Sequence, residues 1–180
     1  MCGIAGFCNW KTDWEKNIRK MNDRMRHRGP DASGIWASED GRVVFGHQRL
    51  SIVDLSENGA QPMQSHSGRF EIAFNGEIYN YKQIAKRLLD EKKVDHFRGG
   101  SDTEVLLEAM EHYGVKEAIS MCKGMFAIAL YDRRSEEVFL VRDRIGKKPL
   151  YYWIEGGNLV FGSELKPLMA CPGFRKEIRR

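Results

Sequence analysis

Apolar side chains recur at intervals of three or four residues near the start of the chain. This spacing places them on one face of a helix, so we expect an amphipathic helix over 11–25. A hydroxyl residue followed three positions later by glutamate typically begins a helix, and Thr12 and Glu15 have this spacing. The helix should end near His27, because Pro30 follows shortly after and disfavours helical backbone before it. The apolar face consists of Trp14, Ile18, Met21 and Met25.

Shorter runs rich in β-branched and aromatic residues predict strands at 43–53 and 70–74. The second run leads into Asn75-Gly76, a dipeptide that strongly favours a tight turn. Beyond residue 125 such runs alternate with short polar connections, which predicts hairpins and antiparallel pairing. The strands expected there are 125–131, 138–142, 150–154 and 159–161.

Two further helices are expected, one at 81–91 and one that begins at Ser101. Ser101 and Glu104 again have the spacing of a helix start. The second helix would bury Val105, Leu106, Ala109, Met110 and Tyr113. The run 125–130 is apolar at every position, so this strand must be covered on both faces. One half-solvated sheet cannot cover it, whereas two stacked sheets flanked by helices can.

Length and composition predict one globular domain. The chain has 180 residues, of which 42% are hydrophobic, enough to fold without disulfides, and no repeat or linker divides it. The net charge of +4 is spread out without a basic block, so nucleic-acid binding is not expected. No run approaches the roughly 20 apolar residues of a membrane span and no signal peptide is recognisable, so we expect a cytoplasmic protein without membrane binding. Residues 175–180 carry no turn or cap, which fits either a solvated tail or a chain that continues in a longer protein.

The cysteines are too few for a disulfide scaffold and lack the spacing of a zinc site, so we expect Cys8, Cys122 and Cys171 to be ordinary buried residues. Cys2 differs, because a methionine before so small a residue is normally removed, which leaves a thiol and a free α-amine on one residue. In model peptides an α-amine titrates at about 7.7–8.0 and a cysteine thiol at about 8.5, so such an amine can accept a thiol proton directly or through a water. A cysteine in second position is more often incidental, so this feature alone leaves both interpretations open.

Several motifs stand in a fixed order along the chain and favour the catalytic interpretation. They are MCGIAGF at 1–7, RHRGPD at 26–31, RLSIVD at 49–54, NGEIYN at 75–80, SDTE at 101–104, RDRIGKKPLYY at 142–152 and GSELK at 162–166. With these motifs the chain resembles the class II glutamine amidotransferases, and most closely the N-terminal glutaminase domain of glutamine-hydrolysing asparagine synthases. The resemblance covers essentially the whole chain. One departure is Gly162, where that branch more often carries alanine.

The resemblance implies one glutaminase domain over residues 1–180 with the N-terminal-nucleophile hydrolase fold. That fold belongs to the α+β class and is a four-layer αββα sandwich of two stacked, mainly antiparallel sheets, in agreement with the covering that 125–130 requires. The resemblance also implies that the loop 26–31 packs beside Cys2 and supports it. No histidine is needed as a base.

The resemblance further implies how the chain would act on L-glutamine. Cys2 would attack the side-chain amide, release ammonia and form a glutamyl thioester that water hydrolyses. Asn75 and Gly76 would form the oxyanion hole. Arg49 would hold the α-carboxylate and Asp102 the α-ammonium group. The other pocket residues would be Leu50, Ile52, Val53 and Glu77. The three apolar ones are equally compatible with packing in the core.

Full asparagine synthases follow this domain with a synthetase domain. No phosphate-binding loop occurs in the sequence, so we expect no cofactor and no metal here, and ATP and Mg only in a synthetase domain that this chain lacks. The partner would be that domain, in the full-length chain or as a separate subunit, docked on an apolar surface within 150–168. The ammonia would serve to make asparagine from aspartate. Another acceptor such as a sugar carboxylate, a non-catalytic docking module, and a homodimer stay open.

Overall fold

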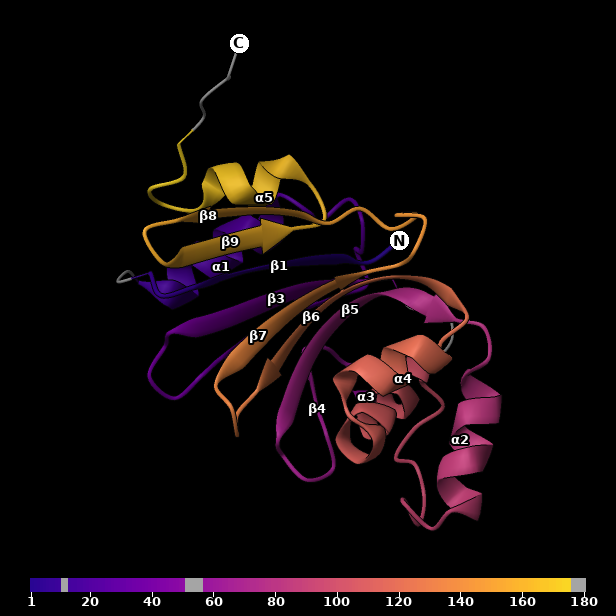
Figure 1. Cartoon of the computed structure of the whole chain (residues 1–180). Helices are drawn as coiled ribbons and strands as arrows, with labels where there is room; N and C mark the ends of the chain where they lie inside the picture. The colour runs from indigo at the N-terminus through magenta and orange to yellow at the C-terminus, as the bar shows by residue number, and fades with distance from the viewer. Residues whose placement is uncertain (11–12, 51–56, 176–180) are drawn as a thin grey trace. The chain divides into compact units, whose positions relative to one another are not determined.

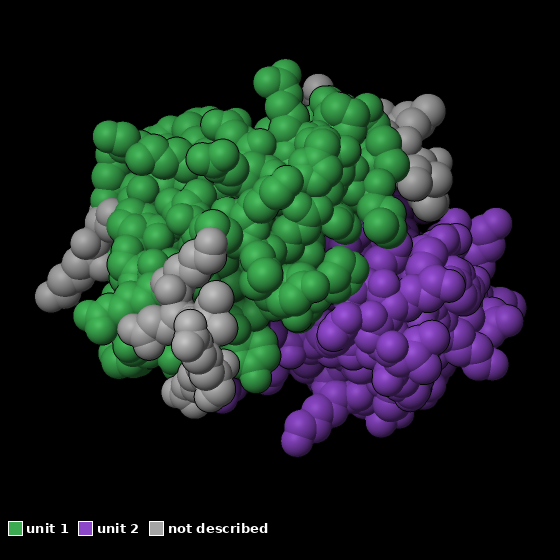
Figure 2. All heavy atoms as spheres, turned by 90° about the horizontal axis from the view of Figure 1, so that it is seen from above, with its two compact units in different colours: residues 1–50, 149–180 green, residues 51–148 purple. Residues whose placement is uncertain are grey.

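The computed structural model describes residues 1–10, 13–50 and 57–175. Contacts among them divide the chain into two compact units, 1–50 with 149–180 and 51–148, which Figure 2 distinguishes by colour. Each unit is built on its own antiparallel sheet with helices (Figure 1). The fold class is therefore α+β, as the sequence predicted.

The first unit contains a sheet in the order β2-β3-β1-β9-β8. Its strands are β1 (Gly3–Cys8), β2 (Ala32–Ala37), β3 (Val43–Arg49), β8 (Tyr151–Glu155) and β9 (Asn158–Gly162). The central strand, β1, is buried at every residue and pairs antiparallel with β3 and β9. Helices α1 (Trp14–Asp23) and α5 (Leu165–Ala170) pack on this sheet and against each other. The residue just before β1, Cys2, is thereby attached to the best-buried strand of the unit.

The second unit contains a sheet in the order β4-β5-β6-β7. Its strands are β4 (Met63–Gln64), β5 (Phe70–Ile78), β6 (Gly124–Asp132) and β7 (Glu137–Arg142). Its helices are the short 3-10 helix η1 (Glu57–Gly59), α2 (Tyr81–Asp90), α3 (Asp102–Tyr113) and α4 (Val115–Met121). The core lies between the sheet and α2, α3 and α4, which gather on one side of the sheet in Figure 1.

Strand β6 confirms the expectation drawn from its apolar run. Phe126 and Ile128 belong to the core under the helices, and the alternate residues Ala127 and Ala129 are also fully buried. Both faces of this strand are therefore covered. The strands predicted after residue 125 are all present, although β7 and β8 lie in different sheets, so the hairpin expected between them is wrong.

The predicted helices are present with small shifts at their ends. Helix α1 is capped by Asp13, whose side chain accepts a hydrogen bond from the Lys16 N–H at 3.1 Å, whereas Thr12, the predicted cap, lies outside the described residues. Ser101 caps α3 as predicted, and its hydroxyl accepts from the N–H groups of Thr103 and Glu104. This cap fixes the end of α3 that carries Asp102.

The turn predicted at Asn75-Gly76 is wrong. Both residues lie inside β5, where Asn75 pairs with Ala127 and Gly76 with Phe126. A Cβ on Gly76 would lie 2.4 Å from the Met125 carbonyl oxygen. The glycine therefore permits close strand pairing, and the dipeptide continues the strand that carries it.

Candidate active site

Cys2 lies directly before β1, and its thiol contacts the backbone of Leu50. The Leu50 N–H donates to Cys2 Sγ at 3.4 Å, and the thiol donates to the Leu50 carbonyl at 3.6 Å. Cys2 is half-buried, so its thiol is fixed by these contacts and is still accessible to a substrate. Met1 precedes Cys2 in the structure, so the Cys2 nitrogen is a peptide nitrogen. A free α-amine on Cys2 requires removal of Met1.

The loop 26–31 lies beside Cys2, as expected. Arg28 Nε donates to the Cys2 carbonyl at 3.0 Å, and Arg28 Nη1 forms an ion pair with Glu164 Oε1 at 3.0 Å. His27 Nε2 contacts the same carboxylate oxygen at 3.0 Å. Burial tends to raise the pKa of Glu164, but these two partners outweigh it and lower the pKa. A charged Glu164 thus holds Arg28, and Arg28 holds the backbone of Cys2.

Arg49 is the last residue of β3, and the loop 26–31 also approaches it. The Asp31 N–H donates to the Arg49 carbonyl at 3.1 Å. A Cβ on Gly29 would lie 2.5 Å from backbone atoms of Gln48 and Arg49, so only glycine allows this approach. Arg49 and Leu50 are both half-buried. The predicted pocket residues Ile52 and Val53 lie outside the described residues.

Asn75 lies on β5 with only 1% of its surface exposed. Its Nδ2 atom is buried and has no hydrogen-bond acceptor within the described part of the chain. Buried amide donors are nearly always paired, so this one stands out. Gly76 and Glu77 follow on the same strand, and the Glu77 side chain is exposed. An unpaired buried donor is what an oxyanion site requires before substrate binds.

Asp102 is 7% exposed at the first position of α3, and its Oδ2 accepts a hydrogen bond from the Ile78 N–H at 2.8 Å. Burial raises the pKa of its carboxyl, against the lowering effect of the N–H groups of Ile78 and Thr103. The nearby Glu77 charge raises this pKa further. A cation bound beside two carboxylates that repel each other lowers the electrostatic energy of the charged pair.

The other three cysteines differ from Cys2 in burial. Burial raises the pKa of Cys8 to about 12, of Cys122 to about 11 and of Cys171 to about 12. Thiols with such pKa values carry almost no thiolate near neutral pH and are poor nucleophiles. The three are buried residues, as the sequence predicted.

Gln61 was not predicted from the sequence, although it joins the elements that carry Asn75 and Asp102. Its Oε1 accepts from the Phe74 N–H at 2.6 Å, and its Nε2 donates to Thr103 Oγ1 at 3.3 Å. Phe74 and Thr103 are the direct neighbours of Asn75 and Asp102. No local pattern marks Gln61, because its partners lie far along the chain. Arg28 and Glu164, by contrast, fall within the motifs 26–31 and 162–166.

Among the described residues, no group of His, Cys, Asp and Glu side chains is arranged to hold a metal ion. No described helix is both long and apolar enough to cross a membrane.

The fold is shared with known amidotransferases. The chain matches the solved structure of the glutamine phosphoribosylpyrophosphate amidotransferase from Bacillus subtilis, complexed with ADP and GMP, with a TM-score of 0.79. The match has 22% sequence identity and covers 94% of this chain and 43% of that chain. This fold, together with the sequence family that residues 1–180 match, defines a class II glutamine amidotransferase domain.

The sequence comparison defines the family more closely. The family model of the glutamine amidotransferase domain matches residues 1–180, and the chain belongs to this family. It is 42% identical over 176 residues to the glutamine-hydrolysing asparagine synthetase 1 of Bacillus subtilis (strain 168), covering 95% of this chain and 27% of that protein. It is 40% identical over 182 residues to the amidase chry2 of Gibberella zeae, covering 94% of this chain and 26% of that protein. The chain thus spans about a quarter of the length of these curated relatives.

Proposed function

We propose that the chain hydrolyses the side-chain amide of L-glutamine to glutamate and ammonia, with Cys2 as nucleophile. The observation that carries this proposal is Asn75 Nδ2, a buried donor without an acceptor among the described residues. Leaving a buried donor unpaired costs about 1–3 kcal/mol. Such a donor can form a hydrogen bond with an oxygen of the bound substrate. It stabilises that oxygen most when the oxygen becomes an oxyanion.

The proposed reaction uses the α-amine of Cys2 as base after Met1 is removed. The amine takes the thiol proton, and the thiolate attacks the amide carbon, so the carbonyl π electrons move onto oxygen. Asn75 and Gly76 stabilise this oxyanion. Its collapse breaks the C–N bond, and the ammonium proton passes to the leaving nitrogen, which departs as ammonia. Water then adds to the thioester, which releases glutamate and restores the thiol.

Substrate recognition in this proposal relies on two opposite charges. Arg49 binds the α-carboxylate through its planar guanidinium, and Asp102 binds the α-ammonium group with Glu77 nearby. The raised pKa of Asp102 supports this role, because an ammonium ion beside the carboxylate relieves its desolvation and the repulsion from Glu77. Leu50 lies against the Cys2 thiol, where it is placed to contact the substrate chain.

We further propose that the ammonia passes to a synthetase domain that makes asparagine from aspartate. The support is the similarity to an asparagine synthetase of which this chain spans 27%. ATP and Mg would be used in that domain. A different acceptor, such as a sugar carboxylate, is the alternative, because the similar proteins are not all named asparagine synthetases: the amidase chry2 is similar to this chain at nearly the same identity. Exposed apolar side chains on β8 and α5 suit the docking of such a domain; they are Tyr151, Tyr152, Ile154, Leu165 and Met169.

The test uses the chain with Met1 removed, as verified by intact mass. It should release ammonia and glutamate from glutamine in equal amounts, and 6-diazo-5-oxo-norleucine should add one covalent group to Cys2. Cys2→Ala should abolish both. Retaining Met1, or any N-terminal extension, should lower turnover by at least about 10²-fold, because the base is then a peptide nitrogen.

Cys8→Ala is the matched control, because it removes a thiol from the adjoining strand β1 without touching Cys2. It should leave turnover unchanged. Undiminished activity in Cys2→Ala would rule out the proposed nucleophile. A correctly processed chain that neither turns over glutamine nor forms the adduct would point to a docking module with the same fold.

A further inference from the structure

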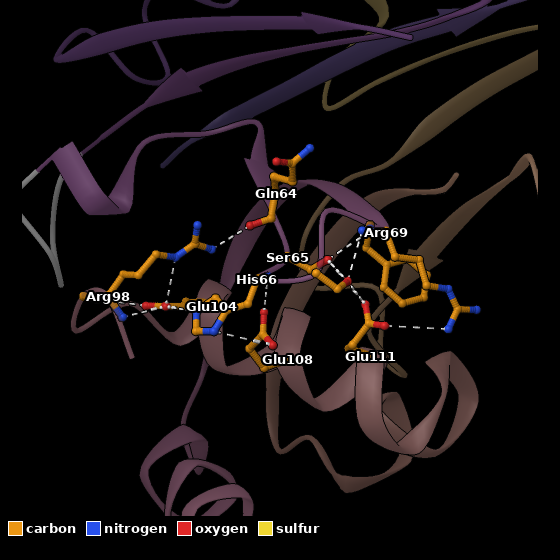
Figure 3. Close-up of polar contacts among 11 residues, drawn as sticks. Gln64, Ser65, His66, Arg69, Arg98, Glu104, Glu108 and Glu111 are labelled. Carbon is orange, nitrogen blue, oxygen red and sulfur yellow. Dashed lines mark hydrogen bonds and ion pairs between the residues drawn. The ribbon is translucent and has the colours of Figure 1, made fainter. Parts of the chain in front are cut away.

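Three glutamates on one face of α3 contact the turn between β4 and β5 (Figure 3). Glu104, Glu108 and Glu111 follow one another at intervals of four and three residues, which aligns them along the helix. The His66 N–H donates to Glu108 Oε1 at 2.8 Å, and Ser67 Oγ donates to Glu111 Oε2 at 2.8 Å. The turn is thus fastened along the length of α3.

Glu104 is the most heavily bonded of the three, with only 1% of its surface exposed. Its Oε1 accepts from the Arg98 N–H at 2.7 Å, and its Oε2 accepts from the Gly99 N–H at 2.9 Å. His66 Nε2 lies 2.7 Å from Oε1. Burial tends to raise the pKa of Glu104, but these donors outweigh it and lower the pKa, so the carboxylate is charged.

These contacts fix the chain that leads into α3. The Arg98 guanidinium completes them, because Nε lies 3.4 Å from Glu104 Oε1 and Nη2 donates to the Gln64 carbonyl at 2.7 Å. The loop 98–100 is thus folded around the Glu104 carboxylate and joined to the end of β4. Ser101 and Asp102 follow directly, so the same carboxylate sets where the first turn of α3 begins.

We propose that Glu104 is a positioning residue for Asp102. It holds loop 98–100 through two backbone bonds and ties α3 to the β4–β5 turn through His66, and so fixes the helix end that presents Asp102 to the α-ammonium group. This inference rests on the proposed glutaminase function. An ammonium contact is equally strong in the ground state and the transition state, so weakening it changes KM and leaves kcat alone.

The experiment compares Glu104→Gln with the parent chain after Met1 removal. The variant keeps the size of the side chain, but its amide places two N–H donors where the carboxylate only accepts. The KM for glutamine should rise about tenfold while kcat stays within about twofold, as expected for the loss of a charge-assisted contact. General destabilisation would lower the active fraction, and hence the apparent kcat, without this change in KM.

Glu111→Gln is the matched control, because it makes the same change on the same face of α3 at its contact with Ser67. Its KM should remain within about twofold of the parent value. If Glu104→Gln fails to fold, His66→Leu decides the question. The His66 side chain is 28% exposed, so its loss is better tolerated, and KM should still rise about threefold. An unchanged KM in the folded Glu104 and His66 variants overturns the proposal.

Hydrogen exchange separates this inference from the proposed function, because it needs no turnover. The Ile78 amide donates to Asp102 Oδ2, and the neighbouring Tyr79 amide donates to the Lys123 carbonyl. Glu104→Gln should speed exchange at Ile78 at least about fivefold relative to Tyr79. If the parent chain releases no ammonia but Ile78 responds, the function fails and the positioning stands. If the chain is active and both KM and Ile78 exchange are unaffected, the positioning role alone fails.

Discussion

The side-chain amides of Asn75 and Asn80 lie five residues apart and differ in their partners. Asn80 Nδ2 donates to the Met121 carbonyl and its Oδ1 accepts from the Lys123 N–H, whereas Asn75 Nδ2 has no acceptor among the described residues. Asn75→Ala should therefore lower kcat by about 10²–10³-fold, the usual loss for one oxyanion donor, with little change in KM. Because no hydrogen bond to Nδ2 is lost, the variant should unfold at nearly the parent denaturant concentration.

Asn80→Ala provides the opposite case. It removes two hydrogen bonds that join the start of α2 to the chain before β6, so it should reduce the free energy of unfolding by about 1–3 kcal/mol and leave kcat intact. Steady-state kinetics and denaturant unfolding of both variants give the comparison. Equal losses of kcat in the two variants would contradict an oxyanion role for Asn75.

Glu71 provides a prediction about stability and pH. Burial raises its pKa from 4.5 to about 7, against the lowering effect of Arg133. The folded state therefore holds this proton more tightly than the unfolded state, so the stabilisation is complete below about pH 4.5 and is lost as pH rises through about 7. At about 1.4 kcal/mol per pKa unit, the loss amounts to about 3 kcal/mol. Glu71→Gln should remove it, making the variant more stable than the parent at pH 8.

Urea unfolding at pH 5 and pH 8 measures this difference. Glu137→Gln is the control, because Glu137 is exposed at the start of β7 and should leave the pH dependence unchanged. If the parent and Glu71→Gln lose the same stability between these pH values, Glu71 does not carry the proton.

At the scale of elements, Gly76 links strand pairing to the site. A Cβ at Gly76 would lie 2.4 Å from the Met125 carbonyl and 2.7 Å from Phe126 Cβ, so β5 and β6 would have to separate. Gly76→Ala should reduce the free energy of unfolding by about 1–3 kcal/mol and lower kcat as well, because Asn75 moves with the strand. Gly100→Ala is the control for stability alone, since a Cβ there meets no atom within 4 Å. Normal stability of Gly76→Ala would show that the strands adjust freely.

Sequence patterns predicted the elements with long apolar repeats and missed those defined by distant partners. Helix α3 and strand β6 were predictable, because the cap at Ser101 and the apolar run at 125–130 are local signals. Strand β1 begins Gly-Ile-Ala-Gly, which has little β propensity and becomes a strand only between β3 and β9. Strands β2 and β4 and the short helices α4 and α5 were missed as well.

The turn predicted at Asn75-Gly76 shows the same limit for the site. The dipeptide favours a turn in isolation, but pairing along the whole of β5 overrides this preference. The motifs supplied Cys2, Arg49, Asn75, Gly76, Glu77 and Asp102 as candidates. They could not supply Gln61 or the burial of Glu104, because both depend on side chains from other elements that meet only in the folded chain.

At the scale of the whole molecule, each unit carries part of the proposed machinery. Cys2 and Arg49 belong to the first unit, and Asn75 and Asp102 to the second. The proposed reaction uses residues of both units, so it predicts that a change at Asp102 alters the reaction of the Cys2 thiol, but only toward reagents that carry an α-ammonium group. Asp102→Asn suits this test, because the amide oxygen can still accept from the Ile78 N–H while the charge is lost.

Asp102→Asn should slow the modification of Cys2 by 6-diazo-5-oxo-norleucine at least about 30-fold, the equivalent of about 2 kcal/mol for a buried charge-assisted contact. Its reaction with iodoacetamide, which has no ammonium group, should change less than about twofold, because the intrinsic reactivity of the thiol is untouched. Intact mass against time measures both rates. Asp95→Asn, an exposed change of the same kind in the same unit, should affect neither. Equal slowing with both reagents would mean that the substitution disturbs the fold in general, and no slowing with either would mean that Asp102 does not bind the substrate.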